Sequence, residues 1–520
     1  MSSSAIAAPR WFGDHRNWFW IGCAMIAAGV LMHLPMLAEA HAMHNRLVGM
    51  AIGPQMVAGM ALIIAGVPIA CWGALGKWPR SRASLHVVEF DPPHSAPLNR
   101  WHVGVLLVLT LGLVIDVMKP ATLGFVLPGL AKEYGIPRST AALLPFVALI
   151  GTTVGSFLWG WIADIYGRRS SILLSTILFV ATSICGAMPR FEWNLVMCFL
   201  MGCSAGGMLP VVYTLLAEIM PARQRSWILV LVGGTGLVGG YLAASGAAHV
   251  FEPHFGWRFL WLQGFPTGLL LLALARLIPE SPHFLRDQGR LNDLRQLEDR
   301  FGIRPVRAAT DDAEHAALGP DIRLTVALAI AALSWSFVNF GLLLWLPSDL
   351  QQRGYSSALA SGIIASSALL AFPTIMIVAW LYARWSSKWT LVGTIAVTFA
   401  GLLGALLPAQ QLAHPLVLVL IVALLIVGAN GMIAVLLPYT AETYRVGIRG
   451  RATGLVAGSS KFGGVAVQAF ALLGFIPTLA GAGAALLSPT LLAGALIGWA
   501  GKETSGRSLP EVEMAQAPAE

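Results

Sequence analysis

The sequence predicts an all-α membrane protein with 14 spans, in which an extra transmembrane hairpin precedes two six-helix bundles that repeat each other. Of its 520 residues, 57% are hydrophobic and only 11% are charged, whereas a soluble protein carries roughly 25% charged residues. Uncharged runs longer than the roughly 18 residues that mark a membrane helix recur along the chain. Landmark residues also recur at one nearly constant offset, which divides twelve of the spans into two equivalent halves.

The apolar segments occur in groups of two, six and six, and two hydrophilic stretches separate the groups. They lie near 17–37, 50–75, 101–125, 140–161, 170–188, 194–219, 226–250, 258–277, 324–346, 358–383, 389–407, 415–437, 450–473 and 476–500. The predicted units are therefore an N-terminal tail (1–16), the hairpin (17–76), a linker (77–100), the first bundle (101–278), a central loop (279–323), the second bundle (324–500) and a C-terminal tail (501–520).

Lysines and arginines orient these units across the membrane. They gather in both tails, the linker, the central loop and alternate short loops, while the remaining loops carry only scattered charges. Because basic loops stay on the cytoplasmic side, we expect both termini to be cytoplasmic in a bacterial-type inner membrane. The net charge of +8 then reflects contact with the lipid bilayer and its topology, and we expect no nucleic-acid partner.

Three pairs of landmarks carry the internal repeat. Glu218 recurs as Glu442, and Glu280 recurs as Glu503. Asp116, in the first span of the first bundle, lines up with Asn339 in the second. Parallel six-helix repeats are typical of carriers that bind a solute between their halves and open alternately to the two sides.

Three motifs add a family resemblance to this pattern. They read GWIADIYGRR at 160–169, PESPHFL at 279–285 and GKETSGRSLPEVE at 501–513. Over residues 100–513 the chain resembles the major facilitator superfamily, in particular its sugar-porter and metabolite–proton symporter branches. Two features depart from the family pattern: Cys198 stands where the fourth helix usually has an arginine, and the hairpin has no counterpart among the usual twelve helices.

The motifs of enzymes and of nucleotide-driven pumps are missing from the sequence. It has no nucleophile elbow, no HExxH zinc motif and no phosphate-binding GxxxxGK[ST] loop. We therefore expect a secondary transporter, with no catalytic residues and no cofactor, that is driven by an ion gradient. The first hypothesis is a proton-coupled symporter for a small organic acid, aromatic acids included, so the expected partners are that solute and a proton.

Three ionisable residues within the spans are candidates for this chemistry. Asp116 lies about fifteen residues, roughly 22 Å, from the cytoplasmic end of its helix, where a carboxylate is costly to ionise and suited to carrying a proton. Lys119 and Lys461 are predicted to contact the negative charge of the substrate. The alternatives are a static Asp116–Lys119 pair at i+3 and a Lys461 that snorkels or pairs with an acidic side chain.

Polar and aromatic side chains in the spans could hold the rest of the substrate. Asn339 and Asn430 are polar and lie deep within their spans, where they could donate and accept hydrogen bonds to a substrate, and Tyr213 could do the same. The alternative for Tyr213 is structural, since tyrosine is common at membrane interfaces.

Charged residues at the cytoplasmic helix ends are predicted to form a gate whose ion pairs break when the carrier opens inward. The family resemblance implies this role, and solvated loop charges are the alternative. The predicted gate residues are Gly160, Asp164, Gly167, Arg168, Arg169, Glu218, Arg223, Arg225, Glu442, Arg449 and Arg451.

The hairpin is rich in methionine and also contains histidine. Thioether and imidazole groups suit copper-like ions, but methionine is also a common filler of apolar helices, so we expect packing and no metal site. The competing hypotheses for the whole chain are a sugar or polyol–proton symporter, a drug exporter, and a sensor built on a carrier scaffold.

Overall fold

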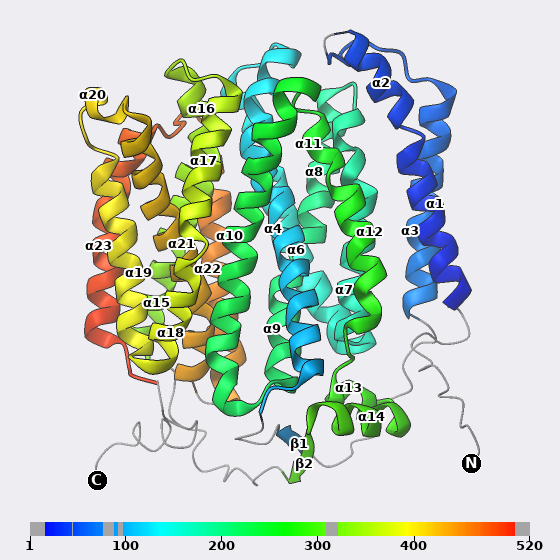
Figure 1. Cartoon of the computed structure of the whole chain (residues 1–520), viewed down its shortest axis with the longest axis vertical. Helices are drawn as coiled ribbons and strands as arrows, with labels where there is room; N and C mark the ends of the chain where they lie inside the picture. The colour runs from blue at the N-terminus through cyan, green and yellow to red at the C-terminus, as the bar shows by residue number, and fades with distance from the viewer. Residues whose placement is uncertain are drawn as a thin grey trace.

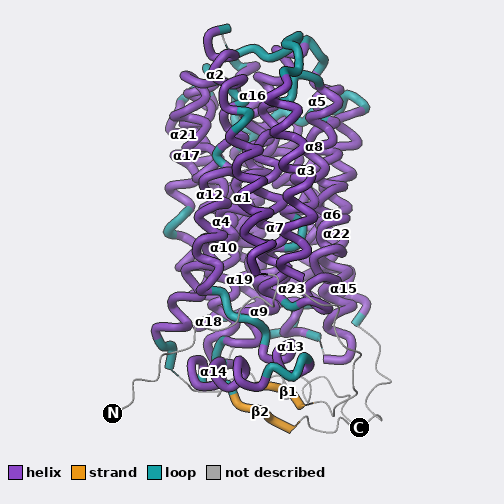
Figure 2. The backbone as a smooth tube through the Cα atoms, turned by 90° about the vertical axis from the view of Figure 1, so that its right-hand side faces the viewer, coloured by secondary structure: helices purple, strands orange, loops and turns teal. Residues whose placement is uncertain are grey.

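The computed structural model describes residues 16–43, 45–75, 88–91, 97–307, 321–444 and 446–504. The expected N-terminal tail, most of the linker and residues 505–520 of the C-terminal tail lie outside this part of the chain. The unit boundaries drawn from the sequence therefore stay predictions. Within the described residues, the chain is built from long helices that run along one axis (Figures 1 and 2).

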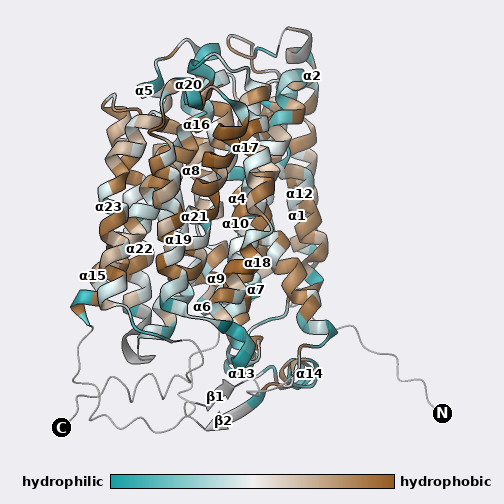
Figure 3. Cartoon of the chain, turned by 60° about the vertical axis from the view of Figure 1, so that its left-hand side comes forward, coloured by the Kyte–Doolittle hydropathy of each residue, from teal (hydrophilic) through white to brown (hydrophobic). Residues whose placement is uncertain are grey.

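Among the described residues, 14 helical segments are long and apolar enough to cross a membrane, which confirms the predicted number of spans. Hydrophobic residues cover the middle of the helices, and hydrophilic ones gather toward both ends (Figure 3). The first bundle contains α4 (Arg100–Tyr134), α5 (Arg138–Ala141), α6 (Leu143–Tyr166), α7 (Arg168–Ala181), α8 (Phe191–Ala205), α9 (Met208–Ile219), α10 (Ala222–Phe255), α11 (Phe259–Leu262) and α12 (Gly264–Leu274).

The second bundle begins with α15 (Ile322–Ser336), which continues through a π-helical stretch (Phe337–Leu343) into α16 (Leu344–Gln352). It continues with α17 (Ser357–Ala371), α18 (Thr374–Arg384), α19 (Ser387–Gly404), α20 (Ala409–Leu412), α21 (Pro415–Thr443), α22 (Val446–Leu472) and α23 (Leu479–Ala500). In Figure 1, α4 and α10 lie near the middle of the molecule, where the first bundle meets the second.

Two short helices, α13 (Pro282–Asp287) and α14 (Leu291–Phe301), lie across one end of the bundle, which is the lower end in Figure 1. We refer to this end as the lower end and to the opposite end as the upper end. Buried Leu294, Leu297 and Phe301 recur on one face of α14, as expected of an amphipathic surface helix. The ring of Phe301 packs edge-on against His102 of α4, with 5.0 Å between ring centroids.

A small sheet at the lower end was not predicted. Strand β1 (Val88–Asp91), from the linker, pairs antiparallel with β2 (Arg304–Arg307), from the central loop, with Val88 opposite Arg307. The Asn99 side chain, just before α4, also donates a hydrogen bond of 2.6 Å to the Arg300 carbonyl. The two hydrophilic stretches that separate the helix groups are therefore joined to each other beneath the first bundle.

The hairpin consists of α1 (Arg16–Leu31), α2 (Leu34–Ala42) and α3 (Pro54–Leu75). Glycines recur every seven residues on each helix, at 22 and 29 on α1 and at 59, 66 and 73 on α3. They allow the helices to approach closely, because a Cβ at Gly22 would lie 2.4 Å from the Ala70 nitrogen and one at Gly73 would lie 2.1 Å from the Phe19 nitrogen. Small residues of this kind are typical of helix contacts in lipid. Met36 and Met56 are buried in the cluster that joins the hairpin to α7 and α12, as packing residues would be.

Glu133 ties the upper end of the hairpin to the first bundle. Its carboxylate accepts hydrogen bonds from the Leu47 backbone at 2.8 Å, from the Trp257 indole at 2.9 Å and from the Arg258 Nη2 atom at 2.8 Å. Arg258 also donates to the carbonyls of Gly186 and Met188, both at 2.9 Å. The hairpin is thereby fixed to the first bundle at its upper end as well as along its length.

The close approach of α1 and α3 gives a first prediction. Gly22→Ala places a methyl group against the backbone of α3, and we expect it to lower stability by about 1–3 kcal/mol. The matched control is Gly246→Ala in α10, where a Cβ meets nothing within 4 Å. Melting temperatures in detergent should fall for the first variant only, and equal melting temperatures would contradict the packing described for the hairpin.

Candidate functional site

The two halves meet along α10, which carries a run of glycines. A Cβ at Gly234 would lie 2.7 Å from Ile375 of α18, and one at Gly239 would lie 2.8 Å from Val114 of α4. The glycines therefore let α10 pack closely against its own bundle and against the second half.

Further close approaches between the halves lie toward the upper end. At the motif glycine near the lower end of α6, by contrast, there is space for a side chain. A Cβ at Gly124 would lie 2.5 Å from the Leu344 carbonyl, and one at Gly464 would lie 3.3 Å from Leu149. A Cβ at Gly160 would meet nothing within 4 Å. The predicted gate residue Gly160 is therefore not at a helix–helix contact in this conformation.

Asp116 and Lys461 lie on opposite halves, within the range of electrostatic interaction. Asp116 lies on α4 and is only 7% exposed, while the half-buried Lys461 lies on α22. Their charges interact, but among the described residues neither side chain has an ion pair within 4 Å. The structure thus brings together, from opposite halves, an acid and a base that the sequence places 345 positions apart.

Lys119 does not share this site. Its ammonium is buried and donates hydrogen bonds to the Phe179 carbonyl at 2.6 Å and to the Thr182 hydroxyl at 2.7 Å. It also lies over the Phe179 ring, 4.5 Å from the centroid. These partners belong to the first bundle, and among the described residues the alternative ion pair between Lys119 and Asp116 is not formed, while the substrate contact of Lys119 stays a prediction.

Asn339 connects the halves by a different contact. It lies in the π-helical stretch of the second bundle and accepts a hydrogen bond of 3.0 Å from the hydroxyl of Tyr241 on α10. Short π-helical insertions occur often at functional sites. The sequence identified Asn339 as a polar residue deep within its span. It did not identify Tyr241 as the partner, because no motif or repeat marks that residue.

Several buried polar atoms have no hydrogen-bond partner among the described residues. They include both amide atoms of Asn430, the hydroxyl of Tyr213 and the indole nitrogen of Trp335. Leaving such groups unpaired costs about 1–3 kcal/mol each, so they are suited to bind a polar ligand. The sequence had singled out Asn430 and Tyr213 for this purpose.

At the lower end, the turn between α6 and α7 is held by ion pairs. Arg168 contacts Asp164 at 3.4 Å and Glu218 at 3.2 Å. The Asp164 side chain is 67% exposed, so its pair with Arg168 contributes little to stability. All three residues belong to the first half, so this cluster shapes the lower end of one half and does not bridge the two.

Glu280 is part of the same turn and was missed as a site residue. Its carboxylate accepts hydrogen bonds from the Arg169 backbone at 3.2 Å and from the Ser281 backbone at 3.0 Å. Burial raises the pKa of this carboxyl, while these N–H groups and the Arg169 guanidinium oppose the shift. Gly167 adopts φ of +97°, and a Cβ there would lie 2.4 Å from the Glu280 carboxylate, so only glycine fits.

The second half repeats this arrangement with other side chains. Glu503 accepts hydrogen bonds from the Ser387 backbone at 2.9 Å and from the Ser387 hydroxyl at 2.7 Å. Glu442, the counterpart of Glu218, accepts from Tyr382 at 2.7 Å and from Thr504 at 2.9 Å. In both halves, therefore, a carboxylate that follows the last helix binds the start of the third helix, where backbone N–H groups are unpaired.

For most of the remaining predicted gate residues, the structure gives the exposure of the side chain. Arg223 and Arg451 are exposed, and Arg225 is half-buried. The side chain of Arg449 lies outside the described part of the structure. Among the described residues, no three histidine, cysteine, aspartate or glutamate side chains are grouped as a metal site.

Two repeated halves of six membrane-spanning helices are the arrangement typical of a membrane carrier. A sequence model of the Major Facilitator Superfamily matches residues 109–468, and the chain belongs to that superfamily. It is a transporter and not an enzyme, as the sequence predicted.

Two curated relatives from Acinetobacter baylyi are similar over most of their length. The niacin transporter NiaP is 27% identical over 386 residues, which cover 71% of this chain and 86% of the relative. The 4-hydroxybenzoate transporter PcaK is 25% identical over 397 residues, which cover 72% of this chain and 84% of the relative.

Solved structures confirm the fold. The proton:xylose symporter XylE bound to 6-bromo-6-deoxy-D-glucose aligns with a TM-score of 0.61 at 19% identity, covering 80% of this chain and 99% of the symporter. The partially occluded inward-open conformation of XylE from E. coli aligns with a TM-score of 0.63 at 17% identity, covering 79% of this chain and all of the neighbour (100%). The hairpin comes in addition to the twelve-helix arrangement that the sequence motifs predicted.

The buried carboxylates of the lower end give a second prediction. We expect Glu280→Ala to lower the free energy of unfolding by about 1–3 kcal/mol, because two backbone N–H groups lose their acceptor. Glu280→Gln should cost less, since the amide oxygen can still accept and no charge is buried. Melting temperatures of both variants check this order, and a larger loss for Glu280→Gln would contradict the acceptor role.

Proposed function

We propose that the chain is a proton-coupled symporter for small organic monocarboxylates, including aromatic ones, and that it works by alternating access. The observation that carries the proposal is the placement of the buried Asp116 and the half-buried Lys461 on opposite halves, close enough for their charges to interact. Support for the substrate class comes from the relatives, whose names specify niacin and 4-hydroxybenzoate. The distribution of lysine and arginine supports an inner-membrane location in which the lower end and both termini are cytoplasmic.

The mechanism follows from the charges of the pair. When Asp116 is ionised, it neutralises the field of Lys461 and repels a second anion. When Asp116 takes up a proton, Lys461 is left as an uncompensated buried cation, which is costly in a low-dielectric site. A substrate carboxylate then restores neutrality, so the proton and the anion bind more favourably together than either does alone.

The polar groups without partners supply the remaining contacts in this proposal. The Asn430 amide and the Tyr213 hydroxyl would hydrogen-bond the substrate, and Asn339 would take part by exchanging its bond to Tyr241. Lys119 is left out of the proposed site because its ammonium is engaged with Phe179 and Thr182. The gate remains part of the proposal, and the pairs of Arg168 with Asp164 and Glu218 fix the turn between α6 and α7 on the first-half side of it.

The proton role is tested with Asp116→Asn, which imitates the protonated acid permanently. In proteoliposomes, we expect this variant to exchange labelled nicotinate for unlabelled nicotinate but to lose accumulation driven by an imposed proton gradient. The matched control is Glu192→Gln, an exposed carboxylate at the upper end, which should accumulate nicotinate normally. Full gradient-driven accumulation by Asp116→Asn would remove Asp116 from proton coupling.

A sugar or polyol symporter is the second candidate, because the solved neighbours include a xylose symporter and the PESP motif is present. Lys461→Gln distinguishes the two. For an anionic substrate, the loss of a buried charge contact should cost at least about 2 kcal/mol, or roughly a thirtyfold rise in KM. Lys388→Gln, at the start of α19, is the control. Uptake of a neutral sugar that survives Lys461→Gln would favour the second candidate.

A further inference from the structure

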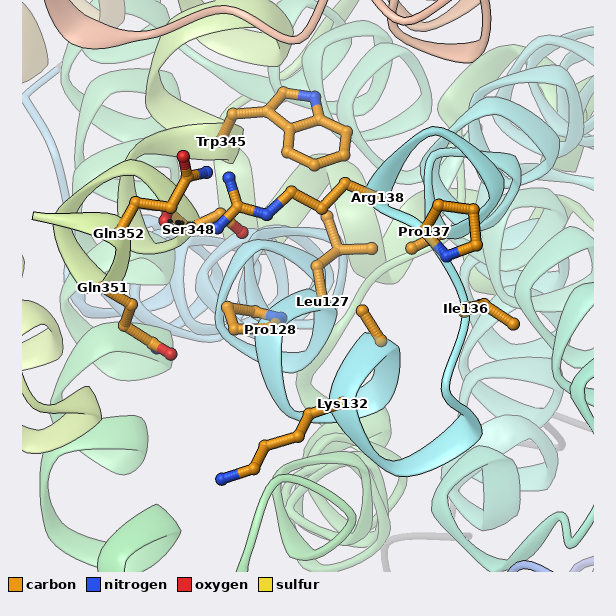
Figure 4. A pocket seen from close by; sticks show the side chains of 12 residues that line it. Leu127, Pro128, Lys132, Ile136, Pro137, Arg138, Trp345, Ser348, Gln351 and Gln352 are labelled. Carbon is orange, nitrogen blue, oxygen red and sulfur yellow. Dashed lines mark hydrogen bonds between the residues drawn. The ribbon is translucent and has the colours of Figure 1, made fainter.

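A pocket of about 440 Å³ opens between the halves at the upper end, far from the Asp116–Lys461 pair. Its walls come from the end of α4, from α5 and the turn before it, and from α16 (Figure 4). Its size falls within the roughly 300–1,000 Å³ range of small-molecule sites. The lining residues are Leu127, Pro128, Ala131, Lys132, Ile136, Pro137, Arg138, Ala141, Trp345, Ser348, Gln351 and Gln352.

The pocket is basic. Lys132 and Arg138 are its charged residues, and none of the twelve lining residues is an aspartate or a glutamate. Asp349 acts on Arg138 from outside the lining, but its carboxylate is shared with the Arg353 guanidinium at 2.9 Å and with the Leu479 backbone at 3.3 Å. Among the described residues, Asp349 therefore offsets only part of the positive charge that the lining carries.

Arg138 reaches across the pocket from the first half to the second. Its Nη2 atom donates to the Ser348 carbonyl at 3.4 Å, which is at the long end for such a bond. Figure 4 shows the guanidinium extending toward Ser348 and Gln352, while Lys132 extends at the rim. A carboxylate would be a stronger partner than this carbonyl, because it carries the opposite charge and can accept two parallel N–H bonds from a guanidinium.

We propose that this pocket is an outer anion site, which binds the carboxylate of an arriving substrate before the halves open. Arg138 and Lys132 would hold the carboxylate, and Leu127, Pro128 and Trp345 would contact the apolar part. Binding would withdraw Arg138 from Ser348 and so release one contact that closes the upper end. This inference rests on the proposed function for its substrate class, namely monocarboxylates.

The test uses a cysteine introduced at the exposed lining position Gln352, because all five native cysteines are buried or half-buried. Purified Gln352→Cys protein is modified with an anionic and with a cationic methanethiosulfonate reagent, and the two rates are compared. We expect the anionic reagent to be favoured and nicotinate, but not its neutral isostere nicotinamide, to slow modification.

In the Lys132→Gln/Arg138→Gln background, the preference for the anionic reagent should fall by about tenfold, and protection by nicotinate should disappear. Arg190→Gln removes one exposed basic charge from the same end and should change neither result. In uptake assays, the double variant should raise the KM for nicotinate and leave kcat at saturation unchanged.

The labelling does not depend on transport, so the two proposals fail separately. If nicotinate is accumulated but gives no protection, or if protection survives the double substitution, the outer site is overturned and the proposed function stands. If no monocarboxylate is accumulated while charge-dependent protection by nicotinate persists, the proposed function is overturned and the outer anion site stands.

Discussion

The interaction on which the proposed mechanism depends is the one between Asp116 and Lys461, which lie on opposite halves of the protein. Each charge alone would be expensive inside the bilayer, and the electrostatic interaction between them offsets part of that cost. Because they do not form a direct ion pair, the acid can take up a proton without breaking a hydrogen-bonded salt bridge. In the proposed mechanism, the same two side chains provide a proton site and a conditional anion site between the halves.

At the lower end, contacts within each half connect its last segment to its third membrane-spanning helix. Glu280 binds the start of α7, and Glu503 binds the start of α19, so in each bundle the segment after the last helix is fixed to the third helix. These contacts lie within one half, which is compatible with halves that rock as rigid bodies. The hairpin contacts α7 and α12 and is tied to Glu133, so it belongs to the first half and would move with it.

The sequence predicted the features that depend on composition and on repetition. These are the 14 spans, the two halves, and which polar and charged residues lie within the spans. It did not predict contacts that depend on side-chain direction. Lys119 stands three residues after Asp116, yet its ammonium turns to Phe179 and Thr182, where α7 gives way to a 3-10 helix (Thr182–Ala187) and carbonyls become available. Glu280 was recognised only as part of a motif and as a repeat landmark, because one of its partners is the backbone N–H group of Arg169, 111 residues away.

The most direct test of the account is the number of protons taken up when substrate binds. Nicotinate is added to purified protein in weakly buffered detergent solution at near-neutral pH, and the pH change is recorded alongside the binding isotherm. The account predicts about one proton taken up per bound nicotinate, no proton uptake with the Asp116→Asn variant, and no binding-linked uptake with Lys461→Gln. Tight binding of nicotinate without proton uptake, or uptake that persists in Asp116→Asn, would contradict it.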